Sequence, residues 1–429
     1  MRVLILSATT GGGHMRAANA LKEYIKKQDN SAIVKISDTI EYVSPFLNKA
    51  VTGGYVYMVR NTPKMYGSIY KNADKSSTPI NKTVELTTTS LRNKLLPLVY
   101  DFHPDIIVTT HPFAAEIVTA LKQNNIINLP IIDIVTDFAI HQAYISDGVD
   151  AYIVSSREMV DQVVERGVNR VHVYPYGIPI MQSFYEEIDR EKAFASEGLD
   201  PSLPTILIMA GSFGVTDVLK IYHKIVKSPE NFQIIVITGK NEKLYETFDD
   251  YLRKITINNT IIELRKAVKA ENAAKSAAKS AKNPKNLMKS PAKQKSQRTV
   301  SKNLKPSKPT ELLYYTNNVD KYMRMADLIV TKPGGLTVSE AIAVGLPMAI
   351  FKAIPGQEEQ NADFLVSKNM AVMLEKKDSC TAVITDLLRN PEKLQNMKKS
   401  INSFSKGNSA ANIYLLMLDL IEKYKKNKI

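Results

Sequence analysis

Short apolar runs alternate with helical patterns along this chain. The first run, at residues 3–7, leads into three glycines, after which Ala17, Ala18, Leu21 and Ile25 recur on one helix face. A buried parallel strand followed by a crossover helix has this pattern. The same alternation predicts further strands at residues 32–36, 106–110, 131–135, 152–155 and 171–174.

The pattern starts again in the second half of the chain. Strands are predicted at residues 205–209, 233–238, 312–315, 328–331 and 348–351, after a turn-rich segment at 175–179. Each half opens with a glycine-rich turn after its first strand, which favours two Rossmann-like, doubly wound α/β domains facing each other across a cleft. We expect a first domain over residues 1–176, a second over 177–411, and a C-terminal helix over 412–429 that could pack back on the first domain.

The positive charge of the chain is concentrated in one segment. The 429 residues carry a formal net charge of +14, and residues 265–309, with 14 Lys or Arg and one acidic residue, account for +13 of it. This segment has no aromatic residue and too little apolar surface to offset the entropy of ordering it. We therefore predict a disordered basic insert at 265–309 in the second domain, whose Ala-rich first part could become helical on a partner.

Composition and motifs exclude several classes of protein. The single Cys380 rules out a disulfide framework. The first residues lack the long apolar region and cleavage site of a signal peptide, and no apolar run is long enough to span a bilayer, so we expect a cytosolic protein. The dinucleotide fingerprint fails because Arg16 stands where its third glycine belongs, and no P-loop motif occurs. No Cys/His cluster has metal-site spacing. We expect no essential metal or other bound cofactor.

Three glycine-rich turns follow predicted strands. They lie at residues 11–14, 211–214 and 333–337. Glycines at such a turn let the backbone approach an anion, and the helix that follows offers free N–H groups and a partial positive charge. One such turn is weak evidence, because glycine-rich turns are common structural devices. Three of them, on both sides of the expected cleft, favour a nucleotide-diphosphate ligand.

Polar residues beside these turns are candidates for the chemistry. His14 opens a helix after three glycines, where a neutral imidazole is favoured and could accept a proton. Glu340 is placed to reach a ribose if the turn at 333–337 holds phosphates, and the polar residues at 357–361 could bond sugar hydroxyls. Each also has an ordinary interpretation: His14 as an exposed residue at the start of a helix, Glu340 as a solvated helix residue, and residues 357–361 as a polar helix start.

Three segments of the chain resemble one known family. They read LILSATTGGGHMRAANAL, IVTDFAIH and VTKPGGLTVSEAIAVGLPMAIFKAIPGQEEQNA. They are similar to the diacylglycerol glycosyltransferases, the group of monogalactosyldiacylglycerol synthase and processive diacylglycerol glucosyltransferase. The resemblance covers nearly the whole chain except the basic insert. It implies the GT-B fold and an inverting transfer of a hexose, glucose or galactose, from a UDP-sugar to diacylglycerol.

The resemblance also implies roles for individual residues. His14 is the first candidate for the base that takes the proton of the acceptor, and Asp137 is the second. The donor would be bound by Gly211, Ser212, Phe213, Gly214, Gly239, Val319, Gly334, Gly335, Leu336, Thr337, Glu340, Gln357, Glu358 and Asn361. The acceptor and membrane side would include Gly12, Gly13, Tyr55, Tyr66, His111 and His141.

An acceptor in a membrane would require the first domain to dock on a bilayer. Residues 42–75 interleave aromatic and apolar residues with Lys and Arg, which is typical of an interfacial segment but also of a packed helical excursion. The basic insert could be a second anchor on an anionic membrane surface. We therefore expect a peripheral protein on the cytoplasmic, inner face of the cell membrane.

Two alternatives stay open from the sequence. The same fold could act on a polyprenyl-linked acceptor in place of diacylglycerol. From a different class, an inactive GT-B body could use its basic loop as a scaffold for membranes or anionic polymers. Because the insert has no aromatic residue to stack on bases, no specific nucleic-acid partner is expected.

Overall fold

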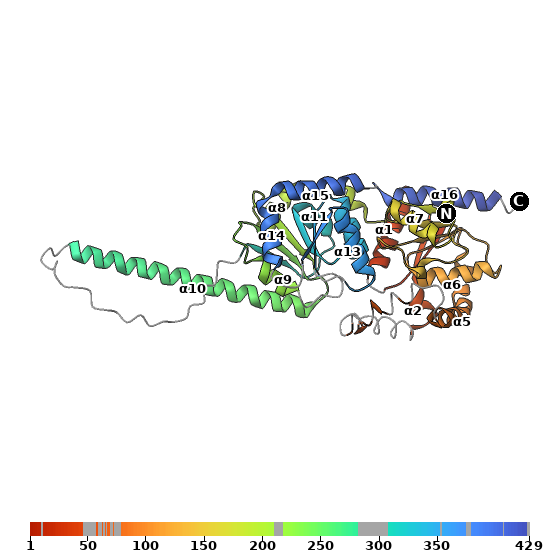
Figure 1. Cartoon of the computed structure of the whole chain (residues 1–429), viewed down its shortest axis with the longest axis horizontal. Helices are drawn as coiled ribbons and strands as arrows, with labels where there is room; N and C mark the ends of the chain where they lie inside the picture. The colour runs from red at the N-terminus through yellow and green to blue at the C-terminus, as the bar shows by residue number, and fades with distance from the viewer. Residues whose placement is uncertain are drawn as a thin grey trace.

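Two six-stranded parallel sheets form the body of the protein and lie side by side along its long axis (Figure 1). The computed structural model describes residues 1–9, 12–45, 57–58, 62, 65, 67–68, 72, 79–209, 218–281, 308–351, 354–374, 379–405 and 407–426. The predicted fold class, two doubly wound α/β units, is confirmed.

The first sheet and its helices come from the N-terminal part of the chain. Their order is β1 (Arg2–Ser7), α1 (Gly13–Gln28), β2 (Ile33–Asp38), α2 (Thr39–Val43), α5 (Pro79–Phe102), β3 (Ile106–Thr109), α6 (Pro112–Gln123), β4 (Ile131–Ile134), η1 (Gln142–Tyr144), β5 (Ala151–Ile153), α7 (Arg157–Glu165), η2 (Arg170–His172) and β6 (Val173–Tyr174).

The second sheet follows, and it includes one strand, β12, that was not predicted. The order is η3 (Gln182–Tyr185), α8 (Arg190–Glu197), β7 (Thr205–Met209), α9 (Val218–Ile225), β8 (Gln233–Ile237), α10 (Glu242–Ala281), β9 (Thr310–Leu313), α11 (Val319–Met325), β10 (Leu328–Thr331), α12 (Gly335–Ala343), β11 (Met348–Phe351), α13 (Gln357–Ser367), β12 (Ala371–Leu374), α14 (Ser379–Arg389), α15 (Pro391–Phe404) and α16 (Ser409–Lys426).

The order of the strands locates the site. The first sheet runs β2-β1-β3-β4-β5-β6, and the second runs β9-β8-β7-β10-β11-β12, which is the order of a Rossmann sheet. The order reverses between β1 and β3 in one sheet and between β7 and β10 in the other. Ligands of open parallel sheets bind beyond the carboxyl ends of the strands at these points. The turns that follow β1 and β10 are therefore where a ligand is expected.

Helices bury both faces of each sheet. In the first sheet, Leu21 and Ile25 of α1 pack on one face together with Ile413 and Met417 of α16, and α5 and α6 cover the opposite face. The C-terminal helix thus returns from the second sheet to cover the first, as the blue ribbon over α1 and α7 shows (Figure 1). Its Tyr424 hydroxyl also donates a hydrogen bond of 2.7 Å to Asp150 after β4. This return ties the two halves of the chain together.

The basic segment differs from its prediction. Residues 265–281 were predicted to be disordered, but they continue α10, so this part of the prediction was wrong. Alanine and lysine are strong helix formers, and Lys275 pairs with Glu271 one turn earlier at 2.6 Å. Residues 282–307 lie outside the described residues. The described part of α10 projects away from the second sheet (Figure 1), and none of the described helices is long and apolar enough to cross a membrane.

Candidate functional site

A cleft of about 1000 Å³ lies between the facing edges of the two sheets. Most of the residues predicted for the site line it: Gly12, Gly13, His14, His111, Asp137, His141, Gly239, Val319, Gly334, Gly335, Leu336, Thr337, Gln357 and Glu358. Glu340 and Asn361 are buried behind its wall. The predicted residues 211–214, Tyr55 and Tyr66 lie outside the described residues.

The two sheets meet through a contact that only glycine allows. Gly335, the first residue of α12, packs on the backbone of Thr136, and a Cβ atom at Gly335 would collide with the Thr136 carbonyl oxygen. Its neighbour Gly334 has open space around the position of a Cβ atom. The glycine at 335 therefore serves the close approach of the first sheet to the start of α12.

Asn361 on α13 bonds the two halves together beside this contact. Its side-chain amide donates to Asp137 Oδ1 and to the Pro333 carbonyl oxygen, both at 3.0 Å, and its Oδ1 accepts from the Phe138 N–H at 2.8 Å. Asn361 is fully buried, so these bonds are shielded from water. Asn361, predicted as a sugar ligand, lies in a position that fixes the geometry of the cleft.

The carboxylate of Asp137 is surrounded by donors from both sides of the cleft. Besides Asn361, the amide of Gln357 and the hydroxyl of Tyr144 donate to Asp137 Oδ2, the latter at 3.2 Å. Burial raises the pKa of Asp137, and these hydrogen bonds oppose the rise. Asp137 therefore accepts a hydrogen bond from the side-chain amide of Gln357, one of the residues predicted to hold a sugar.

His14 is a half-buried, neutral imidazole with a defined orientation. Its Nδ1 lies 2.5 Å from the Thr110 carbonyl oxygen and 2.9 Å from Thr136 Oγ1. Because a carbonyl oxygen can only accept, Nδ1 carries the proton and Nε2 is left as the basic nitrogen. Burial lowers the pKa of His14 to about 4, partly offset by the bond to Thr110. The ring is therefore uncharged at neutral pH and able to accept a proton.

Two further histidines lie on the same side of the cleft. The His111 ring packs edge-on against His14, with ring centroids 4.7 Å apart, and burial and the neighbouring His14 hold the pKa of His111 well below its usual value. His111 caps α6 by accepting from the Phe113 N–H at 3.2 Å, and His141 caps η1 by accepting from the Ala143 N–H at 3.1 Å. Both rings line the cleft while also shaping the turns from which they come.

Arg16 crosses the cleft to Glu340, a contact that was not predicted. The guanidinium on α1 forms an ion pair with Glu340 Oε1 on α12, while Glu340 Oε2 is buried without a hydrogen-bond partner. Burial raises the pKa of Glu340 to about 7, and Arg16 opposes this rise. A buried carboxylate with one unpaired oxygen is costly, so this group is suited to accept hydrogen bonds from a ligand.

The start of α12 offers a second polar element. Its N-cap is Gly334, which has no side chain to bond the first N–H groups of the helix. Such a helix start attracts anions through free N–H groups and the helix dipole. Nearby, Lys332 pairs with Glu358 at 2.8 Å, and Glu358 also accepts from the Ile354 N–H at 2.9 Å. Glu358 is thus already bound within the cleft wall.

The fold has been seen in other proteins. MurG from Acinetobacter baumannii matches with a TM-score of 0.56 over 98% of this chain and 99% of that one, at 13% identity. UDP-GlcNAc 2-epimerase from Neisseria meningitidis matches with a TM-score of 0.54 at 13% identity, over 98% of this chain and 100% of that chain. At such low identities the likeness shows the fold alone. Two facing Rossmann-like domains with a polar cleft between them place the chain among proteins of the GT-B fold.

The sequence relationships identify the family. The family model for monogalactosyldiacylglycerol (MGDG) synthase matches residues 14–180. The family model for the glycosyltransferase family 28 C-terminal domain matches residues 261–413. The processive diacylglycerol beta-glucosyltransferase of Bacillus licheniformis is 27% identical over 422 residues, which are 98% of this chain and 94% of that protein. The chain belongs to the MGDG synthase and glycosyltransferase family 28 group, and it is a glycosyltransferase.

Replacing Gly335 by alanine tests the contact between the sheets. The new methyl group would meet the Thr136 carbonyl oxygen, so the two halves must separate. We expect Gly335→Ala to lose about 1–3 kcal/mol of stability, as overpacking usually does, and to show a lower unfolding midpoint and a larger radius of gyration in X-ray scattering.

Gly334→Ala is the matched control for this variant. Its methyl group meets nothing within 4 Å, and the backbone φ of −73° suits any residue. Its midpoint and radius should match the wild type. If Gly335→Ala also matches the wild type in both measurements, the contact does not set the closure of the cleft.

Proposed function

We propose that this glycosyltransferase transfers a hexose from a UDP-sugar to the hydroxyl group of diacylglycerol, with inversion at the anomeric carbon. The transfer would take place at the cytoplasmic face of the cell membrane, with glucose or galactose as the sugar. The proposal is carried by three features of one cleft. They are a neutral His14 of defined orientation, the start of α12 with its uncapped N–H groups, and Glu340 with one oxygen that has no hydrogen-bond partner. The names of the curated relatives, processive diacylglycerol beta-glucosyltransferases, support the choice of acceptor.

The second sheet would bind the donor. The N–H groups at the start of α12 would hold the diphosphate, and Glu340, about one and a half turns further along the helix, would accept the ribose hydroxyls. Gly239 and Val319 line the part of the cleft where the base would lie. Gln357 and Glu358 would bond the hydroxyls of the sugar.

The reaction would be a direct displacement at the anomeric carbon. The acceptor oxygen forms its bond to this carbon while the bond to the diphosphate oxygen breaks, and the electron pair leaves with UDP. Negative charge grows on the diphosphate, where the helix start stabilises it. The acceptor proton must go to a base.

His14 fits the role of this base better than Asp137. The His14 Nδ1 proton is directed at the Thr110 carbonyl oxygen, which leaves Nε2 ready to accept. The Asp137 carboxylate already accepts bonds from Gln357, Asn361 and Tyr144. In this proposal Asp137 holds the two sides of the cleft together through its hydrogen bonds, and His14 takes the proton.

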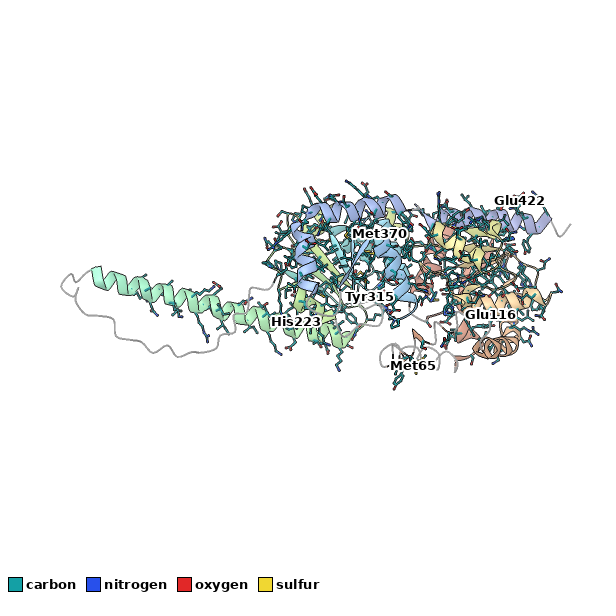
Figure 2. All side chains as sticks on the ribbon, viewed as in Figure 1. Met65, Glu116, His223, Tyr315, Met370 and Glu422 are labelled. Atoms are coloured by element: carbon teal, nitrogen blue, oxygen red, sulfur yellow. The ribbon has the colours of Figure 1, made fainter. Side chains whose placement is uncertain are left out.

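The projecting helix α10 would hold the enzyme on an anionic bilayer. Ile257, Ile261, Leu264 and Val268 recur at helix-face spacing with 40–60% of their surface exposed, and Figure 2 shows this part of the helix standing clear of the body. In Figure 1, α10 starts at the lower edge of the second sheet and runs out to the left, away from α2 and α5 at the lower right. These four residues form an apolar stripe, and basic residues follow it in the chain. Because residues 265–309 carry +13, this part of the helix would favour anionic lipid and would oppose pairing with a second copy of the chain.

The polyprenyl-linked acceptor and the inactive scaffold remain the alternatives. A polyprenyl-linked acceptor would use the same donor side and the same base, so only the choice of acceptor separates it from the proposal. The scaffold would need no defined base, and the orientation of His14 therefore favours an enzyme over a scaffold.

His14→Asn tests the base directly. The asparagine amide can still donate to the Thr110 carbonyl oxygen but has no basic Nε2. We expect kcat to fall by about 10²–10⁴-fold with little change in the KM for the donor, which is the range for the loss of a general base. Transfer to diacylglycerol in detergent micelles is measured by lipid chromatography.

His103→Asn is the control for this substitution. His103 is exposed outside the cleft, and its φ of 47° is one that asparagine tolerates. This variant should keep the wild-type kcat. A His14→Asn enzyme that keeps kcat within threefold of the wild type would place the base elsewhere.

The pKa of Glu340 predicts a pH dependence for binding. Burial raises the pKa of Glu340 to about 7; Arg16 opposes this rise and Asp320 adds to it, so the carboxyl is ionised at pH 8 and mostly protonated at pH 6. An ionised carboxylate accepts both ribose hydroxyls, so the affinity for uridine, which has no titrating phosphate, should fall several-fold from pH 8 to pH 6. Glu340→Gln should bind uridine weakly and without this dependence, as measured by ligand NMR. Equal pH profiles for the two proteins would remove Glu340 from the ribose site.

The apolar stripe of α10 can be tested on vesicles. Ile261→Ser combined with Leu264→Ser removes its centre without changing charge, and we expect binding to anionic vesicles to weaken by about tenfold. Ala267→Ser combined with Ala270→Ser changes exposed residues outside the stripe and should bind as the wild type does. Unchanged sedimentation with vesicles, or a stripe-dependent dimer in ultracentrifugation, would contradict membrane docking by α10.

A further inference from the structure

The starts of α1 and α12 converge at the cleft. A Cβ atom at Gly13, the first residue of α1, would lie 3.8 Å from the Leu336 Cβ in the first turn of α12. Both helices have glycine N-caps, Gly12 and Gly334, without a side-chain capping bond. Two helix starts with uncapped N–H groups therefore face one space, which favours an anion there.

Arg16 lies one turn into α1 and lines this space. The other cationic side chains that line the described cleft are engaged within it: Lys332 pairs with Glu358, and Lys240 lies over the Tyr315 ring at 5.0 Å. The Arg16 side chain is 42% exposed, although its partner Glu340 is 1% exposed. Arg16 is thus the accessible cation beside the two helix starts, and the Glu340 carboxylate holds it there.

The ion pair leaves Glu340 incompletely satisfied. Arg16 binds Oε1, and Oε2 has no partner. A pair of vicinal hydroxyls could bond both oxygens only if Arg16 released Oε1. The guanidinium would then be free, with five N–H donors whose geometry suits phosphate oxygens.

We infer that Arg16 is a ligand of the donor diphosphate, held by Glu340 before the donor binds. This inference rests on the proposed function and adds to it a residue from the first sheet. Donor binding becomes an exchange: the ribose hydroxyls replace Arg16 on Glu340, and Arg16 moves to the diphosphate. The exchange replaces one ion pair by another, so no buried charge is left without a partner.

The test compares UDP with uridine. Arg16→Gln removes the charge, and we expect its affinity for UDP at pH 8 to fall at least tenfold, the usual loss for a charge-assisted bond. Its affinity for uridine should fall by less than its affinity for UDP, because Arg16 no longer competes for Glu340, although the loss of Arg16 also raises the pKa of Glu340. Arg16→Lys keeps the charge and should recover part of the UDP affinity. Binding is measured by calorimetry and ligand NMR.

Lys27→Gln is the matched control. This lysine is exposed on the same helix and lies 4.0 Å from Glu186, so its loss changes the charge of α1 equally, far from the helix start. It should bind both ligands as the wild type does. Retained uridine binding also establishes that Arg16→Gln is folded.

The other outcomes overturn the inference. If Arg16→Gln binds UDP as tightly as the wild type, Arg16 is only a tie between the sheets, and the proposed function stands. If Arg16→Gln loses UDP and uridine to the same extent, its role lies in the fold of the cleft, and the inference falls. If the wild type itself does not bind UDP, both the inference and the proposed function fall.

Discussion

The cleft depends on one close contact, in which the first turn of α12 packs on the backbone of Thr136. A side chain at Gly335 would prevent it. The contact brings the turn after β4, which carries Asp137, against α13, which carries Gln357 and Asn361. It also brings α1, with His14 and Arg16, against the helix that carries Glu340. Residues more than 200 positions apart in the chain become neighbours through this one fit.

Polar groups of the two sheets bond one another across the cleft. Asp137 occupies the amides of Gln357 and Asn361, and Arg16 occupies one oxygen of Glu340. Buried polar groups need partners, and these contacts supply most of them. In the exchange that we infer, a ligand replaces these partners one for one, which would keep the cost of opening the site low. Polar groups of this kind favour a defined arrangement of the two sheets over a loose one.

The sequence was informative where local patterns decide the structure. Apolar runs located most of the strands, and the glycine turns located the helix starts that line the cleft, because turn chemistry is read within a few residues. β12 was missed because four apolar residues alone do not distinguish a strand from a helix. The ion pair between Arg16 and Glu340 spans 324 positions, and no periodicity relates them. The stretch at 265–281 was misjudged because its low apolar content indicated disorder, whereas its alanines and lysines favour helix.

The central claim is that this cleft moves a hexose from UDP to diacylglycerol. The most direct measurement incubates the full chain with labelled UDP-glucose or UDP-galactose and vesicles that contain either diacylglycerol or a polyprenyl-linked acceptor, and separates the lipids by chromatography. We expect one of the donors to give a labelled glycolipid from diacylglycerol. Labelling of the polyprenyl acceptor alone, or no glycolipid with either donor, would contradict the claim.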